Sequence, residues 1–332
     1  MKAKFAPRID TNRTKLVDVL PLDTPYSIYI DPASSCNFAC GFCACGRANI
    51  KNWAEHRKVG LMDFNLFTKV IDDISCFPDK VKAIHLYKEG EPLLNPRLPE
   101  MVEYVKRKEV TNRVDFVSNV SLLTHEKSLQ LIEAGLDRIN ISIEGMDDDL
   151  YEKNAGVRFS FEKIVDNVRF FYEHKKNSIM LVKIPDSFLG NYTQQQFFDT
   201  FGDICDEIAI EYPSGCWPEF EYDTGGVPIK TVSGLKTYSN NICPTIFYGT
   251  TVNSDGTVSA CYVDWNRKVL VGDAKNESLV DIWNGEKLRD LRLRHLRLEL
   301  PNIPVCQSCN EVKLNQIETI DCDREEILKI FN

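Results

Sequence analysis

The sequence lacks the long apolar runs found in membrane proteins and exported precursors. No stretch reaches the roughly 18 consecutive apolar residues of a membrane span, and the segment MKAKFAPRIDTNRTKLVDVL has no apolar core of a signal peptide. We therefore expect a cytoplasmic protein with no membrane partner. Glycine and proline are not in excess and 43% of the residues are apolar, as in an ordinary globular protein.

Positive charge is also in short supply. The chain has 40 Lys and Arg against 49 Asp and Glu, a formal net charge of −9. A protein that binds phosphate backbones usually shows clustered Lys and Arg. The one basic streak, Arg289, Arg292, Arg294 and Arg297, is typical of the solvated face of a helix. We expect no nucleic-acid partner.

Cysteine, by contrast, is abundant, with twelve residues in the chain. Reducing compartments keep thiols free, so twelve cysteines without an export signal favour thiolate ligands over disulfides.

From about Tyr26 to Tyr212 short β-branched runs alternate with amphipathic stretches, which predicts β–α units and a parallel sheet. The expected strands are 27–31, 82–87, 114–118, 138–144, 179–185 and 207–212. The expected helices are 63–75, 98–108, 124–134, 160–174 and 193–202. Right-handed crossovers would curl six such strands into an α/β fold, a partial (β/α)6 barrel.

Ligands of parallel α/β proteins gather at the C-terminal ends of the strands. The segments that follow the expected strands are 36–43, 89–92, 118–119, 142–145, Lys183 and 212–216. We expect them to form one site. His85 lies within an expected strand, so it is interpreted as a core residue.

After residue 217 the alternation stops. We expect a linker, then a hairpin turning at Asp255-Gly256, a helix near 278–295, and a terminal helix from about 323.

The cysteines Cys36, Cys40 and Cys43 form C-x3-C-x2-C after the first expected strand. A structural zinc site or a cubane normally takes four protein ligands, so three leave one corner of a [4Fe–4S] cluster open to a small molecule. A zinc protein can also carry this spacing.

This triad, followed by Gly90-Glu91-Pro92 after the second strand, resembles the radical S-adenosylmethionine (SAM) superfamily. The resemblance implies a TIM-like radical SAM barrel, SAM on the open iron, and Phe42 near the adenine. Glu89 replaces the first glycine of the family's GGEP-like motif, and Val120 replaces the glycine of its TNG-like segment. The implied SAM-binding residues are Phe42, Gly90, Glu91, Pro92, Ser118, Asn119, Ser142 and Glu144, with Arg158 or Lys183 as the counter-charge of the SAM carboxylate.

A second cysteine set comprises Cys243, Cys261, Cys306 and Cys309. Four thiolates suit either zinc or a fully ligated cubane. The surrounding sequence resembles the SPASM/Twitch extension of radical SAM enzymes, in a short form with one auxiliary [4Fe–4S] cluster, and its cysteine spacing resembles that of 2-deoxy-scyllo-inosamine dehydrogenases. The predicted organisation is an N-terminal extension (1–25), a core barrel (26–216), a linker (217–235), a cluster domain (236–312) and a C-terminal helix (313–332).

The resemblance implies an oxidoreductase, a dehydrogenase or epimerase acting on a sugar, aminocyclitol or nucleotide sugar, with a flavodoxin- or ferredoxin-like electron donor as partner. Candidate catalytic residues are Cys216 as a hydrogen donor, and Glu144 and Asp264 as substrate-orienting groups or bases. Two alternatives stay open: a maturase that modifies a ribosomal peptide, and a non-catalytic zinc-binding interaction protein.

Overall fold

The computed structural model describes residues 1–7, 13–46, 59–212, 215, 217–220 and 234–331. Its strands form a single ten-stranded sheet in the order β1-β7-β6-β5-β4-β3-β2-β8-β9-β10. The strands are β1 (Lys4–Phe5), β2 (Ser27–Ile30), β3 (Ala83–His85), β4 (Val114–Ser118), β5 (Arg138–Ser142), β6 (Ile179–Pro185), β7 (Glu207–Glu211), β8 (Gly249–Val252), β9 (Thr257–Ser259) and β10 (Leu270–Asp273).

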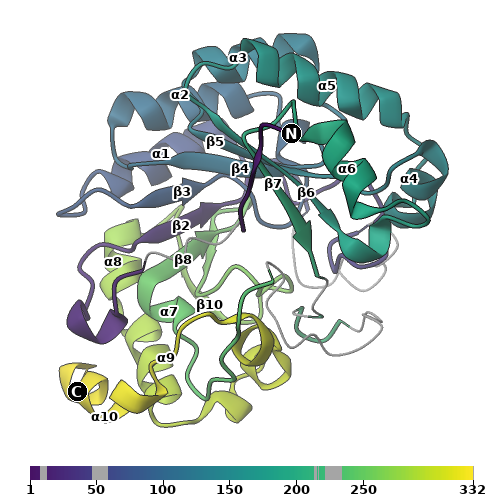
Figure 1. Ribbon diagram of the computed structural model, residues 1–332. Coiled ribbons are helices and arrows are strands. Elements are labelled where there is room, and N and C mark those ends of the chain that lie inside the picture. The colour runs from purple at the N-terminus through teal and green to yellow at the C-terminus, as the bar shows by residue number, and fades with distance from the viewer. Residues whose placement is uncertain (8–12, 47–58, 213–214, 216, 221–233, 332) are drawn as a thin grey trace.

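The six predicted strands are present, and each pairs in parallel with its neighbour along the chain from β2 to β7. Their apolar residues are almost wholly buried, as expected for a parallel sheet covered by helices. Figure 1 shows α1, α2, α3 and α5 in sequence along one face of this sheet. These helices cover a face of the sheet and not the ends of its strands, so the C-terminal ends are available for a site.

The helices are α1 (Phe64–Ile74), α2 (Leu98–Lys108), α3 (His125–Glu133), α4 (Asp148–Ala155), α5 (Phe161–His174), α6 (Gln194–Phe201), α7 (Thr245–Tyr248), α8 (Leu279–Asn284), α9 (Glu286–Leu296) and α10 (Arg324–Phe331). Side-chain caps fix where several begin, because Thr124 and Ser160 accept hydrogen bonds from the first turns of α3 and α5. The five helices predicted between the strands are confirmed within two residues at each end.

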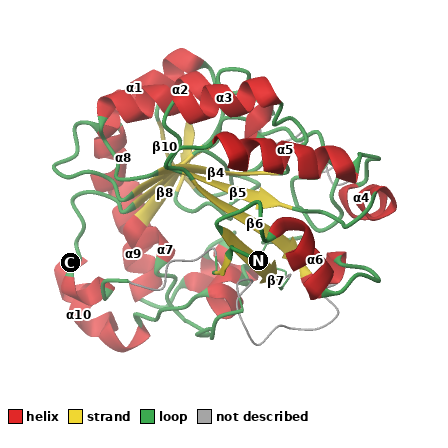
Figure 2. Cartoon of the chain, turned by 45° about the horizontal axis from the view of Figure 1, so that its top comes forward, coloured by secondary structure: helices red, strands yellow, loops and turns green. Residues whose placement is uncertain are grey.

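The C-terminal third extends the same sheet. β8 pairs in parallel with β2, and the predicted hairpin at Asp255-Gly256 is confirmed as the antiparallel pair β8 and β9. Gly256 takes the left-handed conformation (φ +89°) that the turn requires. Figure 2 shows α8 and α9 on the side of β8 and β10, and α8 packs against α1. Most of the predicted linker (217–235) lies outside the described residues, and the sheet contains strands from both sides of it.

Three features differ from the sequence predictions. The helix predicted at 278–295 is two helices, because Gly285 is extended (φ −73°, ψ 160°) between α8 and α9. β1, which pairs with β7, and the short helix α4 were not predicted. The terminal helix expected from about 323 is confirmed as α10, whereas the earlier part of the predicted C-terminal segment (313–332) is not α-helical. In the described ranges no helix has the length and apolar character to cross a membrane.

Candidate active site

The N-terminal cysteines lie in the loop that follows β2. Cys40 is buried, Cys36 and Cys43 are partly buried, and all three line one cavity of about 610 Å³. The loop is tightened by hydrogen bonds from the Cys43 amide to the Cys40 carbonyl (3.2 Å) and from the Gly46 amide to the Cys43 carbonyl (2.9 Å). Burial raises the pKa of the Cys36 thiol to about 12 and that of Cys40 well above its ordinary value. Cluster binding must therefore displace these protons.

The loop after β3 brings Glu91 against the end of β4. The Glu91 carboxylate accepts hydrogen bonds from Ser118 Oγ (2.8 Å), the Asn119 amide (2.9 Å) and the Leu93 amide (3.0 Å). Burial raises the pKa of Glu91, and these donors oppose the rise. Asn119 Nδ2 in turn lies 3.9 Å from Cys36 Sγ. The structure thus joins three predicted site residues from separate strand ends to the cysteine loop.

Gly90 makes this approach possible. A Cβ atom there would lie 2.1 Å from the carbonyl oxygens of both Ala33 and Ser35, which precede the cysteines. A residue with a side chain would push the two loops apart. Pro92 begins a buried 3-10 helix, Pro92–Leu94, and is not among the residues that line the cavity.

Glu89 occupies the position where the family's motif has a glycine, and its side chain faces the C-terminal third of the chain. Its carboxylate lies 2.8 Å from Lys88 Nζ and 3.0 Å from Arg267 Nη2, and Arg267 Nη1 lies 2.6 Å from Asp255. The side chains of Lys88, Glu89 and Arg267 are at most 2% exposed. Burial, reinforced by the Glu89 charge, raises the pKa of neighbouring Asp31 to about 7. This charged cluster ties the loop after β3 to the hairpin of β8 and β9.

The end of β5 supplies Ser142, and Glu144 follows it; both line the cavity. Glu144 Oε2 is buried and has no hydrogen-bond partner in the described chain. Burial raises the pKa of Glu144 to about 7, although the Lys183 charge opposes the rise. An unsatisfied acceptor at the cavity wall suits a ligand that brings a donor.

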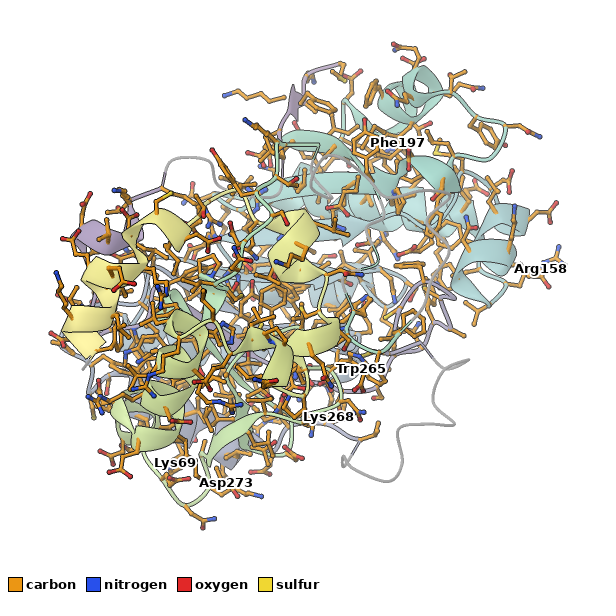
Figure 3. The ribbon with its side chains drawn as sticks, turned by 90° about the horizontal axis from the view of Figure 1, so that it is seen from below. Lys69, Arg158, Phe197, Trp265, Lys268 and Asp273 are labelled. Atoms are coloured by element: carbon orange, nitrogen blue, oxygen red, sulfur yellow. The ribbon has the colours of Figure 1, made fainter. Side chains whose placement is uncertain are left out.

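The two predicted counter-charges for SAM do not line the cavity. Lys183 is buried in an ion pair with Glu211 (2.6 Å). Arg158 is exposed, and Figure 3 shows it at the outer margin of the molecule. Phe42 does line the cavity, and its ring packs edge-on against Phe188 at 5.0 Å.

The four C-terminal cysteines lie close enough to affect one another's ionisation. Burial raises the pKa of Cys243 to about 11, that of Cys306 to about 12, and those of Cys261 and Cys309 well above their ordinary value. For Cys261, the neighbouring Cys243, Cys309 and Cys306 add to the rise, so the four thiols lie within electrostatic reach of one another. No three His, Cys, Asp or Glu side chains of the described residues form a site for a single metal ion. A cubane binds each cysteine through a different iron, so its ligands surround a cluster without meeting at one point.

His295 lies between two of these cysteines, which the sequence analysis did not foresee. Its Nε2 is 3.5 Å from Cys306 Sγ, and its Nδ1 accepts a hydrogen bond from the Cys243 amide (3.4 Å). Burial lowers the pKa of His295 to about 4, so the imidazole is neutral and Nε2 carries the proton. The signal available in the sequence was spacing, because Leu288, Leu291 and His295 recur at i, i+3 and i+7, the period of one helix face.

Two of the three predicted catalytic residues are described. Glu144 faces the cavity, as above. Asp264 is buried outside the cavity lining, and its carboxylate accepts hydrogen bonds from the Lys268 and Val269 amides, both at 2.9 Å, so it closes a backbone turn. Cys216 lies outside the described residues.

Further residues line the cavity on its inner side, and sequence reasoning missed them. They include Ser27, Tyr29 and His85 from β2 and β3, and Tyr262 from the segment after β9. The Tyr29 ring stacks on Tyr262 at 4.9 Å and lies 4.5 Å from the His85 ring. The Tyr262 hydroxyl donates to Glu311 (2.6 Å). Polar residues at alternate positions of otherwise apolar strands were the signal for this inner wall.

Comparison with known proteins gives two family matches. The model described as Radical SAM superfamily matches residues 30–188, and the SPASM model, an iron-sulfur cluster-binding domain, matches residues 243–310. Each range contains one of the two cysteine sets.

A 2-deoxy-scyllo-inosamine dehydrogenase of Niallia circulans, named as S-adenosyl-L-methionine-dependent, is 21% identical over 298 residues, which covers 89% of this chain and 96% of that protein. A cofactor-modifying protein for the tungsten-containing aldehyde ferredoxin oxidoreductase of Pyrococcus furiosus is 32% identical over 117 residues, which covers 35% of this chain and 30% of that protein.

Among solved structures, BtrN in complex with AdoMet and 2-DOIA superposes with a TM-score of 0.58 at 20% identity, covering 88% of this chain and 96% of that one. This likeness confirms the predicted α/β fold class, a partial barrel with a small C-terminal cluster-binding domain.

Proposed function

Because the chain belongs to the radical SAM superfamily and carries a SPASM-type domain, we propose that this radical SAM enzyme oxidises or epimerises a small polar substrate. The substrate class is a sugar, an aminocyclitol or a nucleotide sugar. Reductive cleavage of SAM at a [4Fe–4S] cluster supplies a 5′-deoxyadenosyl radical, which removes a hydrogen atom from carbon.

The observation that carries this proposal is the extent of the cavity. The same cavity is lined by Cys36, Cys40 and Cys43 and by Tyr262 and Glu311, which are close in sequence to Cys261 and Cys309. The volume of about 610 Å³ is typical of small-molecule sites. A substrate held there would share one cavity with the SAM-binding cysteines and with sequence neighbours of the auxiliary set.

The residues of this chain then have defined tasks. The triad would hold the SAM-binding cluster, and Cys243, Cys261, Cys306 and Cys309 the auxiliary cluster. Phe42, Gly90, Ser142 and Glu144 would contact SAM. Glu91, Ser118 and Asn119 would hold the loop after β3 against the end of β4. The cavity wall would orient the reacting carbon and keep water away.

The relative that spans almost the whole chain is named as a dehydrogenase of an aminocyclitol, which supports an oxidation of the same kind. After a hydrogen atom has been removed from the alcohol carbon, oxidation to a ketone still requires an acceptor for one electron. An auxiliary cluster beside the substrate would be that acceptor. We further propose a flavodoxin- or ferredoxin-like electron donor and a cytoplasmic location, where thiols stay reduced.

The test uses cluster-loaded protein, dithionite, SAM and 2-deoxy-scyllo-inosamine carrying deuterium on its ring carbons. We expect deuterium in the released 5′-deoxyadenosine and a ketone product. The Cys36→Ala, Cys40→Ala, Cys43→Ala triple variant, which keeps the second cysteine set, serves as the matched control and should release no 5′-deoxyadenosine.

Two other outcomes would count against the proposal. A fully loaded enzyme that releases no 5′-deoxyadenosine would refute the radical chemistry. Release without deuterium, repeated across other deuterated cyclitols and sugars, would refute the substrate class and favour a ribosomal peptide as the substrate.

A further inference from the structure

Three polar side chains on adjacent strands form a hydrogen-bonded row on the inner wall of the cavity. Asp115 Oδ1 of β4 lies 2.7 Å from His85 Nδ1 of β3, and His85 Nε2 lies 3.1 Å from Ser27 Oγ of β2. The strand register places Asp115 directly opposite His85. Ser27 and His85 line the cavity. Ser27 and His85 are therefore accessible to a ligand in the cavity.

The row fixes which nitrogen of His85 donates to Asp115. A carboxylate only accepts hydrogen bonds, so His85 Nδ1 donates to Asp115, and in the neutral imidazole Nε2 has a lone pair that faces Ser27 Oγ. Burial alone would raise the pKa of Asp115, but His85, Arg113 and Arg138 together hold it below its usual range. Arg113 Nε lies 2.9 Å from the other Asp115 oxygen. Asp115 thus stays ionised and can stabilise an imidazolium.

We infer that Ser27, His85 and Asp115 form the subsite that binds the reacting hydroxyl of a polyol substrate, with His85 Nε2 as the base that accepts its proton. This inference rests on the proposed function and deepens it. Parallel strands normally bury aliphatic side chains, whereas these three side chains are polar and two of them line the cavity. Asp115 acts as a positioning residue through His85.

The proposed oxidation balances at this subsite. The hydrogen atom on the alcohol carbon would go to the 5′-deoxyadenosyl radical, giving 5′-deoxyadenosine, and the hydroxyl proton would go to His85 Nε2. An oxidised cluster held by Cys243, Cys261, Cys306 and Cys309 would accept the remaining electron. The carbon–oxygen single bond would become a carbonyl double bond.

Aromatic rings surround the subsite. The His85 ring lies 4.5 Å from the Tyr29 ring, and Tyr29 stacks at 4.9 Å on Tyr262, the residue after Cys261. Tyr87 lies edge-on to both His85 (5.7 Å) and Tyr29 (5.5 Å). These rings give the apolar face of a cyclitol a packing surface and connect the subsite to the auxiliary cysteines.

The experiment compares His85→Gln with His125→Gln. His125 also pairs with an aspartate (Asp166, 3.0 Å), but this pair is exposed and outside the cavity, so it controls for loss of a His–Asp contact. With 2-deoxy-scyllo-inosamine as the probe, we expect His85→Gln to lower ketone formation at least about 100-fold. Uncoupled release of 5′-deoxyadenosine from SAM and dithionite should stay as in the wild type. A third variant, His85→Ala, should recover ketone formation when imidazole is added.

Each other outcome overturns the inference. Unchanged ketone formation in His85→Gln removes His85 from the reaction. If His85→Gln loses both uncoupled SAM cleavage and ketone formation, and imidazole does not rescue His85→Ala, then the role of His85 is structural. A wild type that cleaves SAM but neither binds nor oxidises the probe or myo-inositol rejects the polyol subsite. A loaded wild type that cannot cleave SAM refutes instead the proposed function itself.

Discussion

Replacing Arg267 by methionine tests whether the buried charged cluster holds the C-terminal hairpin on the loop after β3. The substitution keeps an apolar stem of similar length but leaves Glu89 without its cation at 3.0 Å and Asp255 without its cation at 2.6 Å. Removing one partner of a buried ion pair costs about 3–5 kcal/mol. Lys88 still pairs with Glu89 at 2.8 Å, so we expect the lower end of this range. An entropy of unfolding near 2.1 cal/mol/K per residue converts about 3 kcal/mol into a fall of about 4 °C in Tm.

Thermal unfolding of the cluster-loaded variant, followed by circular dichroism, measures this fall. Lys268→Met is the matched control, since Lys268 is the next residue and pairs with Glu219 at 2.6 Å with both side chains 34% exposed. Figure 3 shows Lys268 at the edge of the molecule. An exposed pair contributes about 1 kcal/mol or less, so Tm should move by roughly 1 °C. Equal shifts in the two variants would refute the reasoning.

Three further perturbations test the site. Gly90→Ala should lower the rate of SAM cleavage about 100-fold, because the added Cβ would displace the cysteine loop. Gly41→Ala is the control, since a Cβ there meets nothing within 4 Å and the rate should not change. Similar rates in the two variants would contradict this. Asp31 has a raised pKa of about 7, so the folded state keeps a proton that the unfolded state loses, and stability should fall as the pH rises from about 4 to 7. Asp31→Asn should flatten that fall in Tm against pH, and an unaltered profile would exclude Asp31 as its source. His295→Leu removes the N–H donor 3.5 Å from Cys306 Sγ. The reduction potential of the auxiliary cluster should become more negative in an EPR redox titration. An unchanged midpoint potential would contradict this.

The order of strands and helices in the barrel was predictable because parallel strands and their covering helices carry strong apolar periodicity. Phe67, Val70, Ile71 and Ile74 are all buried on one face of α1, which is the pattern that predicted it. β1 has only two residues, and its pairing with β7 depends on contacts across two hundred positions, so no local pattern marks it. Gly285 breaks a helical pattern without a proline, and its backbone is extended there.

The cysteine sets and the strand-end residues Glu91, Ser118, Asn119 and Glu144 were predicted from spacing and from the β–α repeat. The roles of Arg158 and Lys183 stay predictions, since neither side chain lines the cavity. A sequence cannot show that a cation already has a partner, as Lys183 has in Glu211.

The inner wall of the cavity was not predicted, although polar residues alternate with apolar ones in its strands. His85 was interpreted as a core residue, and it is indeed hydrogen-bonded and only 7% exposed, yet it also faces the cavity. Its partners Ser27 and Asp115 lie 58 and 30 positions away in the chain. Only the strand register brings them together.

The central claim is that the two cysteine sets bind separate clusters and that the N-terminal one alone cleaves SAM. The direct measurement is iron and sulfide per chain, with EPR and 5′-deoxyadenosine release, for anaerobic wild type, the Cys36, Cys40 and Cys43 alanine variant, and a Cys306→Ala, Cys309→Ala variant. About eight irons should fall to about four in the first variant, with no 5′-deoxyadenosine released. The second variant should lose the auxiliary cluster and still cleave SAM without substrate. Zinc in place of iron, or SAM cleavage that survives loss of the N-terminal triad, would contradict the account.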